Sequence, residues 1–219
     1  MCEIRLLFPV HMRTFFQDDT WQSGLEEIRV RVGQPIEFCY GSDNCYLIGK
    51  EKEQMFCSEK DYRRWEKDLY HASEADLREM LNYISNYSLY AYKEEIKQGY
   101  ITIEGGHRVG VAGQTVLVDG KIAGISPITF LNIRIAHEKC GCAKKILPLI
   151  RQKNSIYNTL ILSMPGAGKT TLLRDSIRAL SNGEAYGIRL KVCVVDERSE
   201  IAASFHGVPQ NDMGPRTDV

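Results

Sequence analysis

A glycine-rich stretch that leads into a helical pattern constrains this chain most: residues 162–174 read LSMPGAGKTTLLR. The phosphate-loop pattern G-x-x-x-x-G-K-[ST] is met at Gly168, Lys169 and Thr170, and it departs only at Ser163, where the pattern has Gly. Such a loop converges backbone N–H groups on a phosphate, and its Lys and hydroxyl serve the outer phosphate oxygens and Mg²⁺. Because Ser disfavours positive φ, we expect slight strain or rearrangement where the loop begins.

The patterns on both sides of this stretch suit a phosphate loop. The apolar run TLILS at 159–163 is typical of a buried parallel strand, and KVCVV at 191–195 predicts a second one. Between them, four apolar residues at helical spacing predict a helix that ends at Asn182-Gly183. The apolar residues of that helix are Leu172, Leu173, Ile177 and Leu180.

We therefore predict a nucleotide-binding loop rather than a glycine-rich turn that merely joins a strand to a helix. The expected ligands are ATP and Mg²⁺. The residues expected to bind the nucleotide are Pro165, Gly166, Ala167, Gly168, Lys169, Thr170 and Thr171.

Acidic residues follow the second apolar run, in the sequence VCVVDERSE. Carboxylates at the carboxyl end of a parallel strand lie over the ligand crevice, where they can order Mg²⁺-bound water or position an attacking water. We predict Thr170 and Asp196 as Mg²⁺ ligands through the nucleotide, and Lys169, Asp196 and Glu197 as catalytic residues, with Glu200 nearby. Only one helix and a short loop separate Lys169 from Asp196. In the larger P-loop ATPases the Mg²⁺-ordering strand commonly comes later in the chain, so we interpret Asp196, Glu197 and Glu200 as an accessory acidic box. The alternative is a helix N-cap in a solvated acidic turn.

The residues before the loop predict an α+β domain. Residues 25–38 read as a strand, a turn and a strand, with Ile28 and Val30 on one face and Arg29 and Arg31 on the other. Ser73 and Asp76 form a variant capping box before a helix that carries Leu77, Met80, Leu81 and Ile84. Further predicted elements are a helix at 89–98, strands at 100–103, 109–112, 115–118, 122–125 and 131–136, and a hairpin turn at Asp119-Gly120.

These patterns predict an α/β protein with three segments. Residues 1–140 form the N-terminal α+β domain, residues 141–158 form a linker, and residues 159–219 form the N-terminal part of a P-loop ATPase domain.

Composition limits the possible partners. Lys plus Arg and Asp plus Glu both number 28, and no basic stripe with interleaved aromatic residues is visible, which disfavours nucleic acid. No apolar run is long enough to span a bilayer and the N-terminus lacks a signal-peptide layout, so we expect a cytoplasmic protein without direct membrane insertion.

The cysteines favour reduced thiols over a disulfide framework, because the seven are odd in number and scattered along the chain. His137, Cys140 and Cys142 lack the usual zinc spacing, which favours plain thiols over a metal site.

Several segments together resemble a known family. They are GGHRVGVAGQTVLVDGKI with LNIRIAHE, then PGAGKTTLLRDSIRALS, then VVDERSEIAASFHGVPQNDMGPRTDV. From about Leu25 to the last residue the chain resembles the stage III sporulation protein AA family, ATPases of endospore-forming bacteria. It is more distantly similar to the secretion and pilus-retraction ATPases. It departs at Ser163, where the family usually has Gly.

The resemblance carries expectations of its own. It implies a ring, commonly a hexamer, with nucleotide held between the N-terminal α+β domain and a RecA-like motor domain. It implies membrane-protein partners in a sporulation channel complex, approached from the mother-cell side. The family's second acidic strand is expected beyond Val219, so the RecA-like domain is expected to be incomplete here. Candidates for arginines that contact phosphate are Arg29, Arg31, Arg108, Arg134 and Arg216.

Three functions remain open from the sequence. The first, which we predict, is a ring-forming ATPase that energises a sporulation channel or secretion-type complex. The second is a nucleotide-binding assembly module that does not hydrolyse ATP. The third is a nucleic-acid ATPase or a small-molecule kinase, against which stand the balanced charge and the lack of a recognisable acceptor-site motif.

Overall fold

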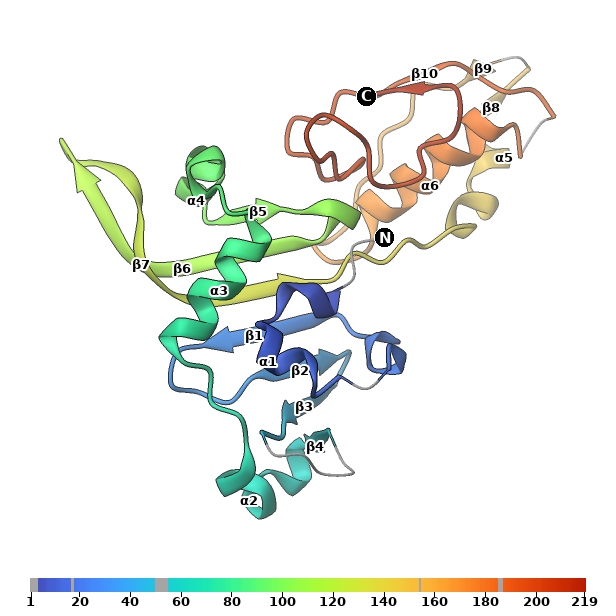
Figure 1. The fold of residues 1–219 in the computed structure, drawn as a ribbon. Coiled ribbons are helices and arrows are strands. Elements are labelled where there is room, and N and C mark those ends of the chain that lie inside the picture. Colours follow the sequence, from blue (N-terminus) through green and yellow to red (C-terminus); the bar gives the residue numbers. More distant parts are fainter. Residues whose placement is uncertain (1–3, 17, 50–54, 154, 185–186) are drawn as a thin grey trace. The chain divides into compact units, whose positions relative to one another are not determined.

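The protein divides into two compact units, Met1–Ala136 and His137–Val219 (Figure 1). The structure is a computed structural model that describes residues 4–16, 18–49, 55–153, 155–184 and 187–219. Each unit has its own helices, strands and buried side chains, and each is described by itself below.

The first unit contains a run of short elements, a long hairpin and one regular helix. In chain order they are η1 Ile4–Leu7, α1 Val10–Arg13, η2 Thr20–Gln22, β1 Glu27–Arg31, β2 Glu37–Tyr40, β3 Asp43–Leu47, β4 Phe56–Ser58, η3 Glu59–Asp61, α2 Tyr62–Trp65, η4 Glu66–Asp68, α3 Glu74–Ile84, η5 Leu89–Tyr92, α4 Lys93–Lys97, β5 Tyr100–Thr102, η6 Glu104–Gly106, β6 Arg108–Val118 and β7 Lys121–Arg134.

The seven described strands of this unit form one sheet in the order β4-β3-β2-β1-β7-β6-β5, and all neighbours are antiparallel. In β1, Ile28 and Val30 are buried while Arg29 and Arg31 are exposed. The predicted strand, turn and strand at 25–38 is therefore confirmed, because one face of the sheet packs on a core and the other meets solvent.

An aromatic cluster from the N-terminal segment packs on this sheet. The ring centroids of Phe8 and Phe16 lie 4.8 Å apart, and those of Phe16 and Trp21 lie 4.6 Å apart. Phe38 of β2 contacts both Phe16 and Trp21 edge-on or tilted. All four side chains are buried, so Phe8, Phe16 and Trp21 cover the sheet through aromatic contacts.

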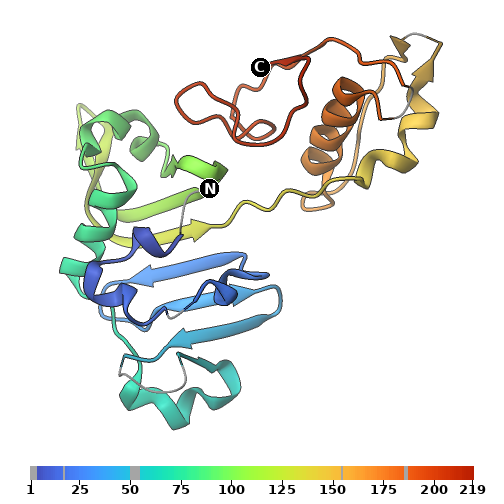
Figure 2. The ribbon, with the colours of Figure 1, turned by 45° about the vertical axis from the view of Figure 1, so that its right-hand side comes forward.

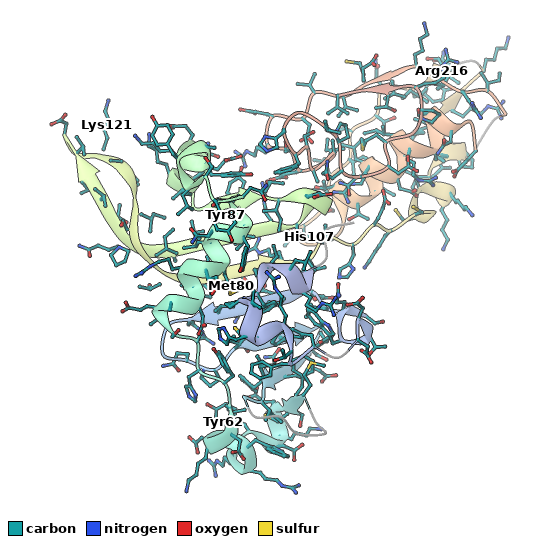
Figure 3. All side chains as sticks on the ribbon, viewed as in Figure 1. Tyr62, Met80, Tyr87, His107, Lys121 and Arg216 are labelled. Carbon is teal, nitrogen blue, oxygen red and sulfur yellow. The ribbon has the colours of Figure 1, made fainter. Side chains whose placement is uncertain are left out.

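Helix α3 lies against the sheet beside β7 (Figure 1). Ser73 caps its N-terminus: its Oγ accepts a hydrogen bond from the Asp76 N–H at 3.1 Å, and Asp76 Oδ2 accepts one from the Ser73 N–H at 2.8 Å. The predicted capping box is therefore confirmed. Its apolar face is buried and includes Met80, which is labelled in Figure 3.

Strands β6 and β7 form one long hairpin. The predicted runs 109–112 and 115–118 lie in a single strand, and the run 122–125 lies in the other. The run predicted at 131–136 lies in that second strand as far as Arg134, where β7 ends. The turn is at Asp119 and Gly120, with φ of 50° and 73°, as the sequence predicts. Lys121, labelled in Figure 3, lies at the tip. Register shifts near Gly113 let the hairpin continue past an irregularity instead of ending there.

The second unit is built around one long helix. Its elements are η7 Cys142–Lys145, α5 Leu147–Ile150, β8 Arg151–Gln152, β9 Ser155–Ile156, α6 Lys169–Asn182, β10 Val192–Cys193 and β11 Thr217–Asp218. Helix α6 ends at Gly183, whose φ is 75°, so the predicted helix and its glycine stop are confirmed. β10 pairs in parallel with β11, and β8 pairs with β9 in antiparallel.

The buried strand predicted at 159–163 is wrong for this structure. These residues form no strand, and Leu160 and Leu162 are each 80% exposed. β10 pairs with β11 instead, and no other described segment hydrogen-bonds to 159–163 as a strand. An apolar run becomes a strand only when a neighbour supplies the ladder of hydrogen bonds, which a local pattern does not show.

Residues predicted as a linker contain folded elements. Within 141–158 lie η7, α5, β8 and β9, and in Figure 2 the yellow segment with η7 and α5 runs beside α6. Ala143 of η7 and Leu147 of α5 form one buried apolar cluster with Ala179 and Leu180 of α6. The division at Ala136 and His137 reflects this packing. Among the described residues no helix combines the length and apolar character that crossing a bilayer needs.

Candidate nucleotide-binding site

Two glycines in the loop before α6 have a left-handed backbone conformation. Gly166 and Gly168 have φ of 77° and 85°, and a Cβ at either position would meet nothing within 4 Å. Glycine is therefore required here by backbone conformation and not by crowding. Ser163 is not among the described non-glycine residues with positive φ, so the expected strain at this position is absent.

Lys169 lies over the loop that precedes it. Its Nζ donates to the carbonyl oxygens of Ser163 and Met164, both at 3.0 Å, and to Ser163 Oγ at 3.3 Å. The Ser163 hydroxyl also donates to the Met164 carbonyl at 3.1 Å. Ser163, which stands where the phosphate-loop pattern has Gly, thus supplies an oxygen that helps to hold Lys169.

Helix α6 begins at Lys169, directly after the left-handed Gly168. The first N–H groups of a helix have no acceptor within the helix, and the helix dipole favours an anion there. The residues of the loop and first turn predicted to bind nucleotide thus surround one helix N-terminus. Pro165, Gly166, Ala167 and Gly168 are exposed, and Lys169, Thr170 and Thr171 are half-buried.

A cavity of about 310 Å³ opens beside this helix start. Lys169 and Thr170 line it from α6, and Asp196, Glu197 and Glu200 line it from the segment after β10. The remaining lining residues are Ile161, Leu173, Arg198 and Ile201. The structure therefore brings the lysine, the hydroxyl and the acidic residues together in the lining of one pocket.

Asp196 has a structural task in this pocket. Its Oδ1 accepts the Glu200 N–H, and its Oδ2 accepts the N–H groups of Ile201 and Ala202, all at 2.9 Å. A carboxylate that accepts several backbone N–H groups fixes the local chain path. Glu197 and Glu200, in contrast, are exposed. We name residues 196–202 the acidic loop.

The acidic loop also contacts a residue that the sequence does not single out. Arg174, one turn into α6, donates to two carbonyl groups of this loop. An arginine in a helical pattern is predicted to be a solvated side chain, because the sequence does not show a distant partner. No local signal therefore predicts this contact.

A buried charge network fixes the other side of α6. Asp175 Oδ2 accepts the Ala143 N–H at 2.7 Å, and Asp175 Oδ1 accepts Nε and Nη2 of Arg178 at 3.0 and 2.8 Å. Burial would raise the pKa of Asp175, but hydrogen bonds from the backbone of Ala143 and Gly141 and from Arg178 lower it to about 2. Arg178 in turn pairs with Glu184.

The described cysteines are free thiols. Six cysteines form no disulfide, while Cys2 lies outside the described residues. No group of three His, Cys, Asp or Glu side chains among the described residues is arranged to hold a metal. Cys142 Sγ lies 3.7 Å from the Thr171 carbonyl, and burial raises the pKa of its thiol.

Among the described residues, four of the five arginine candidates for phosphate contact have a partner within their own unit. Arg29 pairs with Glu27, and Arg31 donates to Glu37 at 3.0 Å. Arg108 lies over the Tyr100 ring at 4.2 Å. Arg216 donates to the Arg189 carbonyl at 2.9 Å. Arg134 of β7 is exposed and lies opposite Arg108 of β6.

Comparison with known proteins gives three findings. Residues 2–219 match the family described as Sporulation stage III, protein AA. Stage III sporulation protein AA of Bacillus subtilis (strain 168) is 39% identical over 221 residues, which cover 100% of this chain and 65% of that protein. The chain thus spans less than two thirds of that relative's length.

Among solved structures, the X-ray structure of the Legionella pneumophila ATPase DotB aligns with a TM-score of 0.42 and 18% identity, over 80% of this chain and 42% of that chain. The family match covers residues 2–219 and therefore includes both units of the fold. This chain belongs to the Sporulation stage III, protein AA family.

Proposed function

We propose that this chain binds ATP with Mg²⁺ and acts as an ATP-hydrolysing motor that energises a sporulation channel or secretion-type complex. One observation carries the proposal: Lys169 and Thr170, at the start of α6, share a cavity of about 310 Å³ with Asp196, Glu197 and Glu200. Family membership supports the sporulation setting.

The residues present fit a nucleotide phosphate. The left-handed Gly166 and Gly168 let the backbone curve around an anion, and the N-terminus of α6 favours negative charge. Lys169 Nζ already binds the loop oxygens of Ser163 and Met164, so phosphate oxygens can replace acceptors of the same kind. These features together suit a polyphosphate better than a neutral ligand.

The residues also fit a hard divalent cation. The Thr170 hydroxyl and the carboxylates of Glu197 and Glu200 offer the oxygen ligands that Mg²⁺ prefers, directly or through water. Bound Mg²⁺ would supply charge neutralisation to the phosphates during transfer. The exposed Glu197 is the residue we assign to positioning water, and Lys169 stabilises charge on the outer phosphate.

Asp196 is proposed as a contributor to the magnesium site in addition to its structural task. Its two oxygens accept three backbone N–H groups, and a carboxylate has about four lone-pair positions. One acceptor position is left on Oδ1, which suits a water held between the carboxylate and a cation.

The working assembly is part of the proposal. We infer a ring of copies of this protein, commonly six by family resemblance, that acts from the mother-cell cytoplasm on membrane proteins of the channel. The equal numbers of basic and acidic residues support protein partners over nucleic acid.

A second candidate function is a nucleotide-binding assembly module without hydrolysis. The engagement of Asp196 by three backbone donors favours it, because a carboxylate used for folding has less freedom to act in chemistry. This function predicts that ATP binds without release of phosphate.

The test replaces Glu197 by Gln and follows both the binding of a fluorescent ATP analogue and the release of phosphate. We expect Glu197→Gln to bind nucleotide as the wild type does and to lower the release rate by roughly a hundredfold, the scale of a lost general base. Glu104→Gln, an exposed acidic residue of the first unit, is the charge-matched control. Wild-type binding without phosphate release would instead establish the assembly module.

A further inference from the structure

Arg174 connects the phosphate-loop helix to the acidic loop. Its Nε donates to the Ile201 carbonyl at 2.6 Å, and its Nη2 donates to the Glu200 carbonyl at 2.8 Å. The two acceptors belong to successive residues, and the side chain is half-buried. A planar guanidinium can serve two such carbonyls at once in a fixed orientation.

The same stretch of backbone is held from two other directions. Asp196 accepts the N–H groups of Glu200 and Ile201, and Asn211 Nδ2 donates to the Ile201 carbonyl at 2.9 Å. The backbone groups of residues 200 and 201 are therefore satisfied by side chains from α6, from the end of the β10 segment and from the following loop. Such contacts fix where a loop lies, and not only its internal shape.

The position of this loop matters for the cavity. Glu197 and Glu200 line the cavity from the acidic loop, and Lys169 and Thr170 line it from α6. Arg174 is the described side chain of α6 that donates hydrogen bonds to the acidic loop. Arg174 thus links the segment that carries the two carboxylates to the helix that carries Lys169 and Thr170.

The backbone of this region has features of a strained segment. Ser199 and Ala203, inside and just after the acidic loop, have φ of 49° and 50°. Non-glycine residues in this conformation persist where surrounding contacts hold them. Arg174 and Asp196 supply such contacts to the intervening residues.

We propose that Arg174 is a positioning residue that sets the acidic loop against the first turn of α6, so that Glu197 and Glu200 stand opposite Lys169 and Thr170. The proposal rests on the nucleotide function proposed above. Arg174 acts through the backbone of the acidic loop and needs no contact with ATP.

The experiment compares Arg174→Gln, Arg174→Lys and the control Arg189→Gln in the 219-residue chain. Arg189 is exposed and does not line the cavity, so its replacement removes the same charge from the same unit. Amide hydrogen exchange at Glu200, Ile201 and Ala202 measures the order of the acidic loop. Fluorescent ATP binding and phosphate release measure affinity and turnover separately, and thermal unfolding checks that each variant is folded.

We expect Arg174→Gln to speed exchange at these three amides and to lower phosphate release by tenfold or more, the scale of about 10–100-fold seen when supporting hydrogen bonds are lost. Nucleotide affinity should stay within about threefold, because a loss confined to turnover marks groups that act after binding. Arg174→Lys, which keeps one charged donor, should lie between wild type and Arg174→Gln.

Two results overturn the proposal, and they are distinguishable. If Arg174→Gln matches Arg189→Gln in both exchange and turnover, Arg174 does not position the loop, while the nucleotide function stands. If the wild type itself shows no saturable nucleotide binding, the proposed function fails, and this inference fails with it before any variant is compared.

Discussion

Two buried side chains on α6, Asp175 and Arg178, join this helix to the segments around it. Asp175 accepts the Ala143 N–H at one end of the network, and Arg178 pairs with Glu184 at the other. Asp175 and Arg178 are 3% and 8% exposed. Arg178 has two carboxylate partners, Asp175 and Glu184, whereas Asp175 pairs with Arg178 and also accepts the Ala143 N–H. Asp175 thus ties the helix that carries the candidate phosphate site to the backbone at Ala143.

Replacing Asp175 by Ala should lower the free energy of unfolding of the second unit by about 1–3 kcal/mol, because it leaves the Ala143 N–H without its acceptor while Arg178 keeps its pair with Glu184. Urea denaturation, followed by circular dichroism, measures this loss. Asp212→Ala, an exposed carboxylate whose bond to the Gly214 N–H is local, should cost much less. Equal losses in the two variants would contradict the assigned role.

The same carboxylate predicts a pH dependence of stability. Its pKa is lowered in the folded protein from 3.8 to about 2, so it contributes stability above its unfolded pKa. That contribution is lost as pH falls from about 4 through about 2, and it amounts to roughly 2 kcal/mol. Urea midpoints measured between pH 5 and pH 2 should fall more steeply for wild type than for Asp175→Asn. Parallel slopes would show that Asp175 is not the group that titrates.

Sequence alone predicts the site residues unequally. Lys169 and Thr170 follow from motif spacing, since their positions relative to the glycines fix their place at the helix start. Arg174 does not follow, because its partners are backbone carbonyls of residues that a sequence pattern cannot place in space. For the same reason the three backbone contacts of Asp196 come only from the structure.

At the scale of elements, the β6 and β7 hairpin shows how one glycine permits close strand approach. An added Cβ at Gly113 would lie 2.0 Å from the Pro127 carbonyl oxygen and 2.9 Å from Ile128 Cα. Both obstacles are backbone atoms, which cannot rotate away. Gly124, on the facing strand, has nothing within 4 Å of the same position and no positive φ.

The two glycines make a matched pair of variants. Gly113→Ala should destabilise the first unit by about 1–3 kcal/mol, the usual cost of forcing a methyl group into an occupied space. Gly124→Ala should be neutral or slightly stabilising, because it restricts the unfolded chain without a clash. Thermal unfolding of both variants gives the comparison, and a Gly124→Ala loss as large as that of Gly113→Ala would contradict it.

Elements with strong local signals are the ones that the sequence predicts. Helices α3 and α6 carry their own capping signals at Ser73 and Gly183, and the hairpin carries Asp119-Gly120. The run at 159–163 has apolar character but no local signal that decides its partner, and it forms no strand. The aromatic packing of Phe8 and Phe16 on the sheet is likewise a long-range event.

At the scale of the whole molecule, the chain is two folded units joined at Ala136 and His137. The loop, the acidic loop and α6 all lie in the second unit, so the proposed nucleotide contacts can be tested without any assumption about the first. The chain spans 65% of the length of its Bacillus subtilis relative, and the motor function is a proposal.

The most direct measurement is a titration of Mg²⁺ and a fluorescent ATP analogue against this chain, Lys169→Ala and the control Lys145→Ala, an exposed lysine outside the cavity. Lys169 supplies the ammonium that the account assigns to the outer phosphates. We predict saturable binding by wild type and Lys145→Ala, and a loss of at least about tenfold in affinity for Lys169→Ala, the scale of one charge-assisted contact of roughly 1.5–3 kcal/mol. Equal binding by wild type and Lys169→Ala would contradict the nucleotide site.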